Sequence, residues 1–262
     1  MEYNCTNCSQ TIAGTFCNHC GQKKYHRIDR KYIWDEAQYM FLHTNKGFLY
    51  SVKNIIKNPG KTARGFIDGK RVNHYKPLLL AFVLSGISAF ISFKIIKLND
   101  VMLAHYSAKH ANSALMRDYM AFTSSYNSII MLLAIPFLAI FTWLVFRKWG
   151  NNYYEHIIMN AYIFSFYTIV SIIIVCPLLL LLKSNVPAFV TVSMASLLII
   201  PLILVWFYKG FYKEKPLKNI IGKVIVILVL ILLVYLLLAM IAGVVLVMVK
   251  GPAALKYMQA PK

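Results

Sequence analysis

Charged residues are scarce in this sequence, and acidic ones are the scarcest. Only 14% of the 262 residues are charged, and nine Asp and Glu stand against 28 Lys and Arg. Soluble domains are about 25% charged. A soluble fold of this size has too little interior for a chain that is 59% hydrophobic, with a mean hydropathy of +0.59. The composition therefore excludes an ordinary soluble domain and indicates a protein whose solvent is largely lipid.

Ionisable side chains are also missing from the middle of every long apolar run. Such residues are the usual proton carriers of transporters, so their absence argues against a proton-coupled transporter. Paired carboxylates and metal-ligand sets are missing there too, which counts against a membrane-embedded enzyme. Glu155 and His156 stand just before the third run, and Asn160 lies near its start. A cavity lined by these three side chains would favour lipid handling or catalysis.

A cleavable signal peptide is not apparent, because the first 76 residues are polar or amphipathic. We expect the first apolar run to be a permanent helix that follows a cytoplasmic N-terminal domain.

Five apolar runs are present that can each cross a hydrocarbon core, which takes about 20 residues. They predict an all-α fold, a polytopic bundle of about five spans over residues 77–249 with a tail at 250–262. The expected spans are about 77–97, 128–146, 157–180, 187–208 and 224–249.

Basic residues alternate between abundant and sparse from one loop to the next. The loop after the first span balances Lys109 and Arg117 with two Asp, whereas the loop after the fourth span holds five Lys. Cytoplasmic loops carry the excess of Lys and Arg. The pattern predicts a cytoplasmic N-terminus and, for five spans, an external C-terminus.

Four cysteines near the N-terminus have the spacing C-x2-C-x8-C-x2-C. Two residues between thiolates let one tight turn present both sulfurs to one metal ion, so two such turns complete a closed, structural zinc site. The ligands would be Cys5, Cys8, Cys17 and Cys20, within a knuckle over residues 1–24. Gly21 suits a turn that needs positive φ. A redox dithiol or an iron–sulfur cluster is the alternative; Cys176, inside the third span, reads as a core residue.

A basic amphipathic segment, here called the neck, covers residues 25–76. Apolar residues on one helical face predict a helix near 33–41, which Asp29 would cap, and a second near 48–56 that ends at Asn58-Pro59-Gly60. Such helices either lie in the membrane interface or pack on the spanning bundle.

Lys61, Arg64, Lys70 and Arg71 are concentrated between Pro59-Gly60 and the first span. They are candidates to contact anionic lipid head groups or a protein partner, with Lys70 and Arg71 fixing the knuckle against the bundle. Gly60, Gly65 and Gly69 indicate a defined backbone path there. Gly60-Lys61-Thr62 does not form a phosphate loop, because Ile55 stands where that motif needs glycine.

The knuckle and neck together resemble a family of membrane proteins labelled domain of unknown function 3667. The resemblance rests on the four cysteines with Gly21-Gln22, on Pro59-Gly60, and on Asp68-Gly69-Lys70-Arg71 with Pro77. It implies an origin in Bacteroidetes, and hence the bacterial inner membrane, but no activity. Five spans with a cytoplasmic N-terminus are also similar in topology to the Yip family.

Small polar residues are grouped within two spans. Ser85, Gly86 and Ser88 suit close helix packing in the first span. Ser165, Thr168 and Ser171 in the third indicate either a helix–helix contact or a polar path.

Three functions compete for this sequence. The first is a non-enzymatic membrane adaptor or scaffold whose knuckle and neck bind a cytoplasmic protein or anionic lipid. The second is a transporter or channel for a small molecule or lipid, and the third is a lipid-modifying enzyme. We expect no enzymatic activity, because the sequence shows no catalytic constellation. We expect no nucleic-acid partner, because most basic residues lie close to the ends of apolar runs; a homo-oligomer stays open.

Overall fold

The computed structural model describes residues 3–24, 27–33, 47–108, 113–251 and 253–258. Five of its helices are long and apolar enough to cross a membrane: Pro77–Ile95, Asn127–Trp149, Tyr153–Leu181, Val186–Phe211 and Leu217–Val249. This confirms the all-α bundle of five spans.

The membrane spans are assembled from several helical elements. The first consists of α4 (Pro77–Ala89) and the π-helical η1 (Phe90–Ile95), and the second of α7 (Asn127–Phe146) and η2 (Arg147–Trp149). The third joins α8 (Tyr153–Val170), the π-helical η3 (Ser171–Val175) and α9 (Cys176–Leu181). The fourth joins α10 (Val186–Ala195), η4 (Ser196–Leu198) and α11 (Ile199–Phe211), and the fifth is α12 (Leu217–Lys250).

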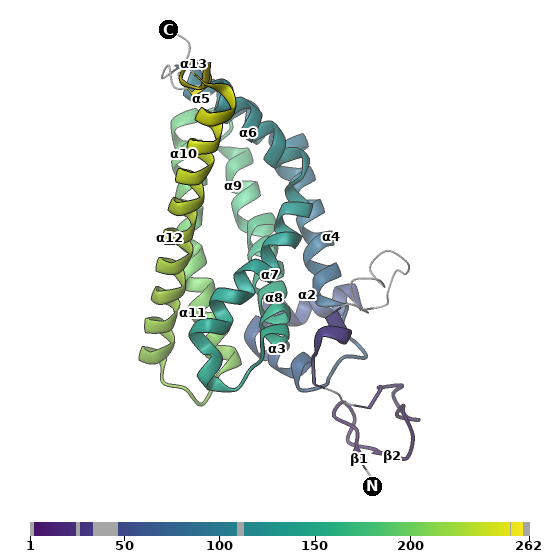
Figure 1. Ribbon diagram of the computed structural model, residues 1–262. Helices are drawn as coiled ribbons and strands as arrows, with labels where there is room; N and C mark the ends of the chain where they lie inside the picture. Colours follow the sequence, from purple (N-terminus) through teal and green to yellow (C-terminus); the bar gives the residue numbers. More distant parts are fainter. Residues whose placement is uncertain (1–2, 25–26, 34–46, 109–112, 252, 259–262) are drawn as a thin grey trace.

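The two ends of the bundle carry different structures (Figure 1). The N-terminal unit, with β1 (Tyr3–Asn4) and β2 (Thr11–Ile12), lies at one end beside α2 (Phe48–Lys57) and α3 (Pro59–Ile67). The other end holds α5 (Leu98–Ala108), α6 (Ala114–Ser125) and α13 (Ala253–Met258), together with the C-terminus. The segment between the first two spans, expected as a loop, is therefore largely helical.

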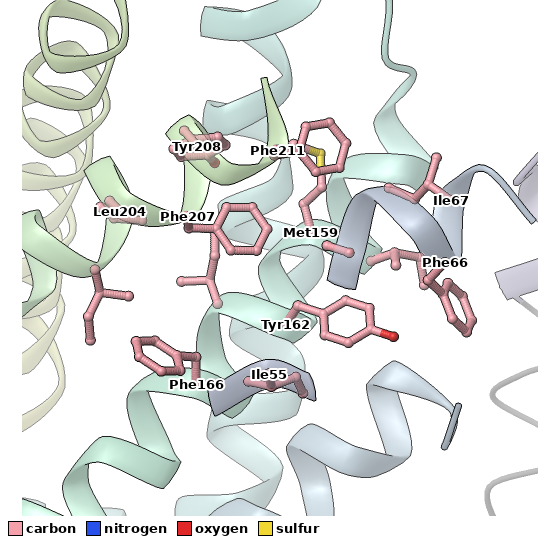
Figure 2. Packing of buried hydrophobic residues seen from close by; sticks show 14 of the residues in the cluster. Ile55, Phe66, Ile67, Met159, Tyr162, Phe166, Leu204, Phe207, Tyr208 and Phe211 are labelled. Carbon is pink, nitrogen blue, oxygen red and sulfur yellow. The ribbon is translucent and has the colours of Figure 1, made fainter. Parts of the chain in front are cut away.

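The neck helices pack on the bundle. Ile55 of α2 and Phe66 of α3 are buried in the main core with Tyr162 of α8 and Phe207 of α11. Figure 2 shows these side chains meeting between the ribbons of the neck and of the two spans. For α2, the second predicted neck helix, the choice between interface and bundle is therefore answered in favour of the bundle. Of the first neck helix, Arg30–Ile33 is helical, and residues 34–41 lie outside the described residues.

Helix α3 was not expected from the sequence. The second neck helix does end near Asn58, but Pro59 then starts another helix instead of leading into a loop. Asn58 makes this switch, because its extended backbone ends α2 while its side chain accepts a hydrogen bond from the Lys61 N–H. Proline at the first helical position fits this arrangement, since its missing N–H has no partner to lose there.

Candidate functional site: the knuckle and the basic cavity

The four N-terminal cysteines converge on one point. The Sγ atoms of Cys5 and Cys20 lie 3.6 Å apart, as do those of Cys8 and Cys17. All four Sγ atoms lie within 4.8 Å of one another. A tetrahedron with metal–sulfur bonds of about 2.3 Å has sulfur–sulfur edges of roughly 3.8 Å. The cysteines could therefore hold one metal ion, and the separations are far too long for disulfides, whose sulfurs lie about 2.05 Å apart.

Two equivalent turns build this cluster. In the first, the Ser9 N–H donates to the Cys5 carbonyl, and in the second the Gly21 N–H donates to the Cys17 carbonyl. Ser9 and Gly21 both have positive φ, 63° and 70°. The left-handed conformation expected at Gly21 is therefore present, and a serine adopts it in the matching turn. Within the second turn, a hydrogen bond to the backbone of Gln22 lowers the pKa of Cys20. The pKa of Cys8 is raised, because its hydrogen bond to the backbone of Gln10 is outweighed by burial and the neighbouring thiols. A thiolate is the form that binds metal.

The side chain of Gln22 attaches the knuckle to the neck. Gln22 is only 3% exposed. Its Nε2 donates to the Gly69 carbonyl over 2.6 Å, and its Oε1 accepts from the backbone N–H groups of Arg71 (3.3 Å) and Val72 (3.1 Å). One amide thus satisfies three backbone groups of the turn that precedes the first span.

A second attachment joins the chain just after the knuckle to the third span. Arg27 Nε lies 2.9 Å from Glu155 Oε1, and Arg27 Nη2 donates to the Gly150 carbonyl. Glu155 is 3% exposed, and its carboxylate also accepts from the Asn152 N–H in the capping box that starts α8. Asn152 Nδ2 in turn donates to the Ile28 carbonyl. The knuckle is therefore held at two separate points on the bundle.

A cavity of 910 Å³ lies between α2, α3 and the connection from α11 to α12. Its cationic lining residues come from both sides of the gap: Lys57, Lys61, Arg64, Lys70, Lys213 and Lys215. Two acidic residues, Asp68 and Glu214, also line it, and Asp68 is paired with Arg64 at 2.9 Å. We call this space the basic cavity. Its excess of positive charge suits an anionic ligand.

The lysines on the neck side are available to such a ligand. Lys57, Lys61 and Lys70 are exposed and make no side-chain hydrogen bond or ion pair with any other described residue. Lys209 behaves differently, because its Nζ donates to the carbonyls of Lys213 and Lys215 and so holds the α11–α12 connection in place. The opposite wall of the basic cavity is therefore braced from within.

Three of the four basic residues singled out in the sequence, Lys61, Arg64 and Lys70, line the basic cavity. Arg71 lies elsewhere: its guanidinium packs over the rings of Tyr32 and Phe66 and donates to the Phe66 carbonyl. It packs on the turn after α3, and its backbone N–H donates to Gln22 of the knuckle.

Sequence reasoning missed the rest of the lining. Lys57 follows an apolar helical face, and Lys213 and Lys215 were used only to orient the spans. Their excess in the loop after the fourth span was the available signal, but only the fold shows that this loop faces the neck. Glu155, His156 and Asn160 do not share a role: Glu155 caps α8, while Asn160 Nδ2 donates to Thr142 Oγ1 of α7 and to the His156 carbonyl.

A family described as a protein of unknown function, DUF3667, matches residues 45–89. The match covers α2, α3, the turn that Gln22 contacts, and the start of the first span. This supports the family label. No curated protein and no solved structure matches the chain. The origin in Bacteroidetes and the likeness to the Yip family stay predictions.

Proposed function

We propose that this protein is a membrane-anchored adaptor whose knuckle-bearing end binds the head group of an anionic phospholipid in the basic cavity. The observation that carries the proposal is the convergence of six cationic side chains from the neck and from the α11–α12 connection on one space. In such an adaptor, the knuckle lies at the end of the protein where the basic cavity binds the lipid.

The position of the basic cavity favours a lipid over a soluble anion. Trp149 and Phe211 line it, and each is the last residue of a span. Lys213 and Lys215 follow directly after the fourth span. These positions support a cavity at the level where the hydrocarbon core ends and phosphates begin, and each basic residue near an anionic surface contributes about 1 kcal/mol.

Retention of lipid by the purified protein tests the proposal. Native mass spectrometry after extraction from vesicles containing phosphatidylglycerol should show the parent protein holding anionic lipid. A Lys61→Gln, Lys70→Gln variant should bind it roughly 30-fold more weakly, since two charges contribute about 2 kcal/mol. A Lys94→Gln, Lys97→Gln variant removes two exposed charges at the other end of the first span and is the matched control. Equal retention by the two variants would reject the cavity; retention of an acidic peptide instead of lipid would make it a protein-docking site.

Zinc is the metal that we assign to the four cysteines. Four thiolates at tetrahedral spacing form a closed site that suits a structural ion. Elemental analysis should give about one zinc per chain, and a Cys17→Ser, Cys20→Ser variant should lose it while the spans keep their helical circular dichroism. Iron in the parent protein, or zinc that survives the double substitution, would contradict the assignment.

The membrane that fits this function is the inner membrane of a bacterium. The knuckle would then lie in the cytoplasm, and the C-terminus would lie outside. The support is the excess of Lys at the knuckle-bearing end, where Lys57, Lys61, Lys213 and Lys215 gather. A reporter after Met1 should read cytoplasmic, and one after Lys262 should read external. A cytoplasmic C-terminus would reverse the expected topology.

A further inference from the structure

A second cavity lies inside the bundle, in the part of the spans farther from the knuckle. It has a volume of 230 Å³ and is lined by residues of the first four spans and by Leu98 of α5. Seven serine and threonine hydroxyls line it: Ser85, Ser88 and Ser92 from the first span, Thr168 and Ser171 from the third, and Ser193 and Ser196 from the fourth. We call it the hydroxyl cavity.

The spacing of these residues explains why they meet. Residues three or four positions apart share one face of a helix. Ser85, Ser88 and Ser92 therefore form one stripe, and Thr168 with Ser171 forms another on the facing span. The sequence left open whether Ser165, Thr168 and Ser171 mark a helix–helix contact or a polar path. The structure places Thr168 and Ser171, but not Ser165, around the cavity.

Several of the hydroxyls are not used up by the fold. Ser85 donates to the Phe82 carbonyl and Ser196 to the Ser193 carbonyl, as isolated hydroxyls in helices usually do. By contrast, Ser88, Ser171 and Ser193 make no side-chain hydrogen bond to any other described residue. Their hydroxyls remain as donors and acceptors for whatever fills the cavity.

Two interruptions of helix geometry lie at the same place. In η1 the Ile96 N–H reaches back five residues to the Ile91 carbonyl, and in η3 the Cys176 N–H reaches back five residues to Ser171. Ser92 lies in the first and Ser171 in the second. Such π-turns are rare and recur at functional sites. Their coincidence on two facing spans, around half-buried hydroxyls with no partner among the described residues, points to a binding site.

The chemistry of the lining selects the ligand. No charged residue is among the described residues that line the hydroxyl cavity. An ion would lose its hydration there without a countercharge, at a cost of several kcal/mol. Hydroxyl groups both donate and accept, so they match a ligand that does the same. The volume is below the 300–1,000 Å³ of typical drug-sized sites, so the ligand is small.

We propose that the hydroxyl cavity binds a small uncharged polyol. The proposal stands on the lining of this cavity and does not depend on lipid binding at the basic cavity. It adds a solute site, within the spans, to a protein whose other end is cationic.

Saturation-transfer NMR in nanodiscs of neutral lipid, with glycerol and erythritol as probes, tests this site. The parent protein should give a saturable signal for which the two polyols compete. A Ser88→Ala, Ser171→Ala variant should bind about tenfold more weakly, the effect of two neutral hydrogen bonds. Ser165→Ala is the matched control: Ser165 is buried in α8, donates to the Ala161 carbonyl and does not line the cavity, so it should bind as the parent does.

A substitution that fills the cavity and a charged competitor test the polyol proposal further. Ala89→Leu places a larger side chain on the wall of the cavity and should abolish the signal. A non-saturable signal that is equal in the parent and the alanine pair would mean that the cavity holds only water, and the proposal would be wrong. Stronger competition by glycerol 3-phosphate than by glycerol would also overturn it, because an uncharged lining cannot prefer an anion. The alanine pair decides the matter even if Ala89→Leu does not fold.

Discussion

Gln10 and Gln22 each follow the second cysteine of a pair by two residues, and the backbone of each accepts the hydrogen bond that closes its turn. Their side chains differ, because Gln10 is exposed whereas Gln22 is buried against the turn at Gly69–Val72. Gln10 therefore closes a turn within the knuckle, whereas Gln22 closes the matching turn and also joins the knuckle to the neck.

Replacing Gln22 should loosen the attachment of the knuckle to the neck. We expect Gln22→Ala to weaken docking by about 2 kcal/mol, since it removes three hydrogen bonds whose net contributions are about 0.5–1.5 kcal/mol each. Hydrogen exchange measured by mass spectrometry should then be roughly 30-fold faster at the backbone amides of Arg71 and Val72.

Gln10→Ala provides the matched control for this experiment. It changes the same position of the other turn and should leave exchange at residues 69–72 as in the parent. Unchanged exchange in Gln22→Ala would show that the knuckle is held by the Arg27–Glu155 contact alone.

His74 lies between the neck helices and the basic cavity. Its ring meets Tyr50 and Phe66 edge-on, with centroids at 5.0 and 6.1 Å. Burial lowers the pKa of His74 from 6.5 to about 4, so the ring is neutral in the folded protein at pH 7.

The pKa of His74 predicts how stability depends on pH. Below about pH 6.5 the unfolded chain takes up a proton at this residue, whereas the folded chain does so only near pH 4. The unfolded state therefore binds more protons in this window, and stability falls as the pH falls from 6.5 to 4. His74→Gln cannot titrate, so its unfolding midpoint should drop less than that of the parent between pH 7.5 and 5. Equal drops would show that His74 does not contribute.

At the scale of elements, the contact between α3 and α11 decides how the neck sits. Gly60 of α3 lies against the backbone of α11: a Cβ there would be 2.0 Å from the Phe207 carbonyl oxygen and 2.7 Å from the Phe211 nitrogen. A Cβ on Gly210 would lie 2.5 Å from Asn58 Oδ1. Gly60 thus lets the backbones of α3 and α11 touch. Asn58, Gly210 and Phe211, next to this contact, line the basic cavity.

Gly60→Ala should push these helices apart. We expect it to destabilise the protein by about 3 kcal/mol, the upper range for overpacking in a core. Thermal unfolding in detergent measures the effect. Gly65→Ala is the control in the same helix, because its Cβ would meet only Lys70 Cδ at 3.9 Å, so its midpoint should match or exceed that of the parent. A similar loss in both variants would contradict the close contact.

The same element shows where sequence reasoning stops. Hydropathy alone predicts the five spans, and cysteine spacing alone predicts the cluster, because each of these features is set by residues that lie close together in the sequence. Helix α3 was missed because Pro59-Gly60 is a common helix end, and its use as a helix start depends on the cap at Asn58 and on packing against Gly210. Glycines at 60 and 69 did mark a defined path, but their partners lie far away in the chain.

At the scale of the whole molecule, the knuckle, the neck and the start of the third span are joined at one end of the bundle. Gln22 of the knuckle, Gly69–Val72 of the neck and Glu155 of the third span are joined by contacts across 47 to 128 residues. The hydrophobic periodicity of the sequence does not predict contacts between residues so far apart in the chain. Long-range contacts of this kind bring the basic residues of the neck and of the α11–α12 connection to a single cavity.

The binding of an anionic head group in this cavity is the central claim, and photo-crosslinking tests it most directly. Phosphatidylglycerol with a photoreactive head group, incorporated into vesicles with the protein, should label residues 57–70 and 210–215. Excess unlabelled phosphatidylglycerol should remove this label, and phosphatidylcholine should not. Label spread over the lipid-facing spans, with no competition by anionic lipid, would contradict the claim.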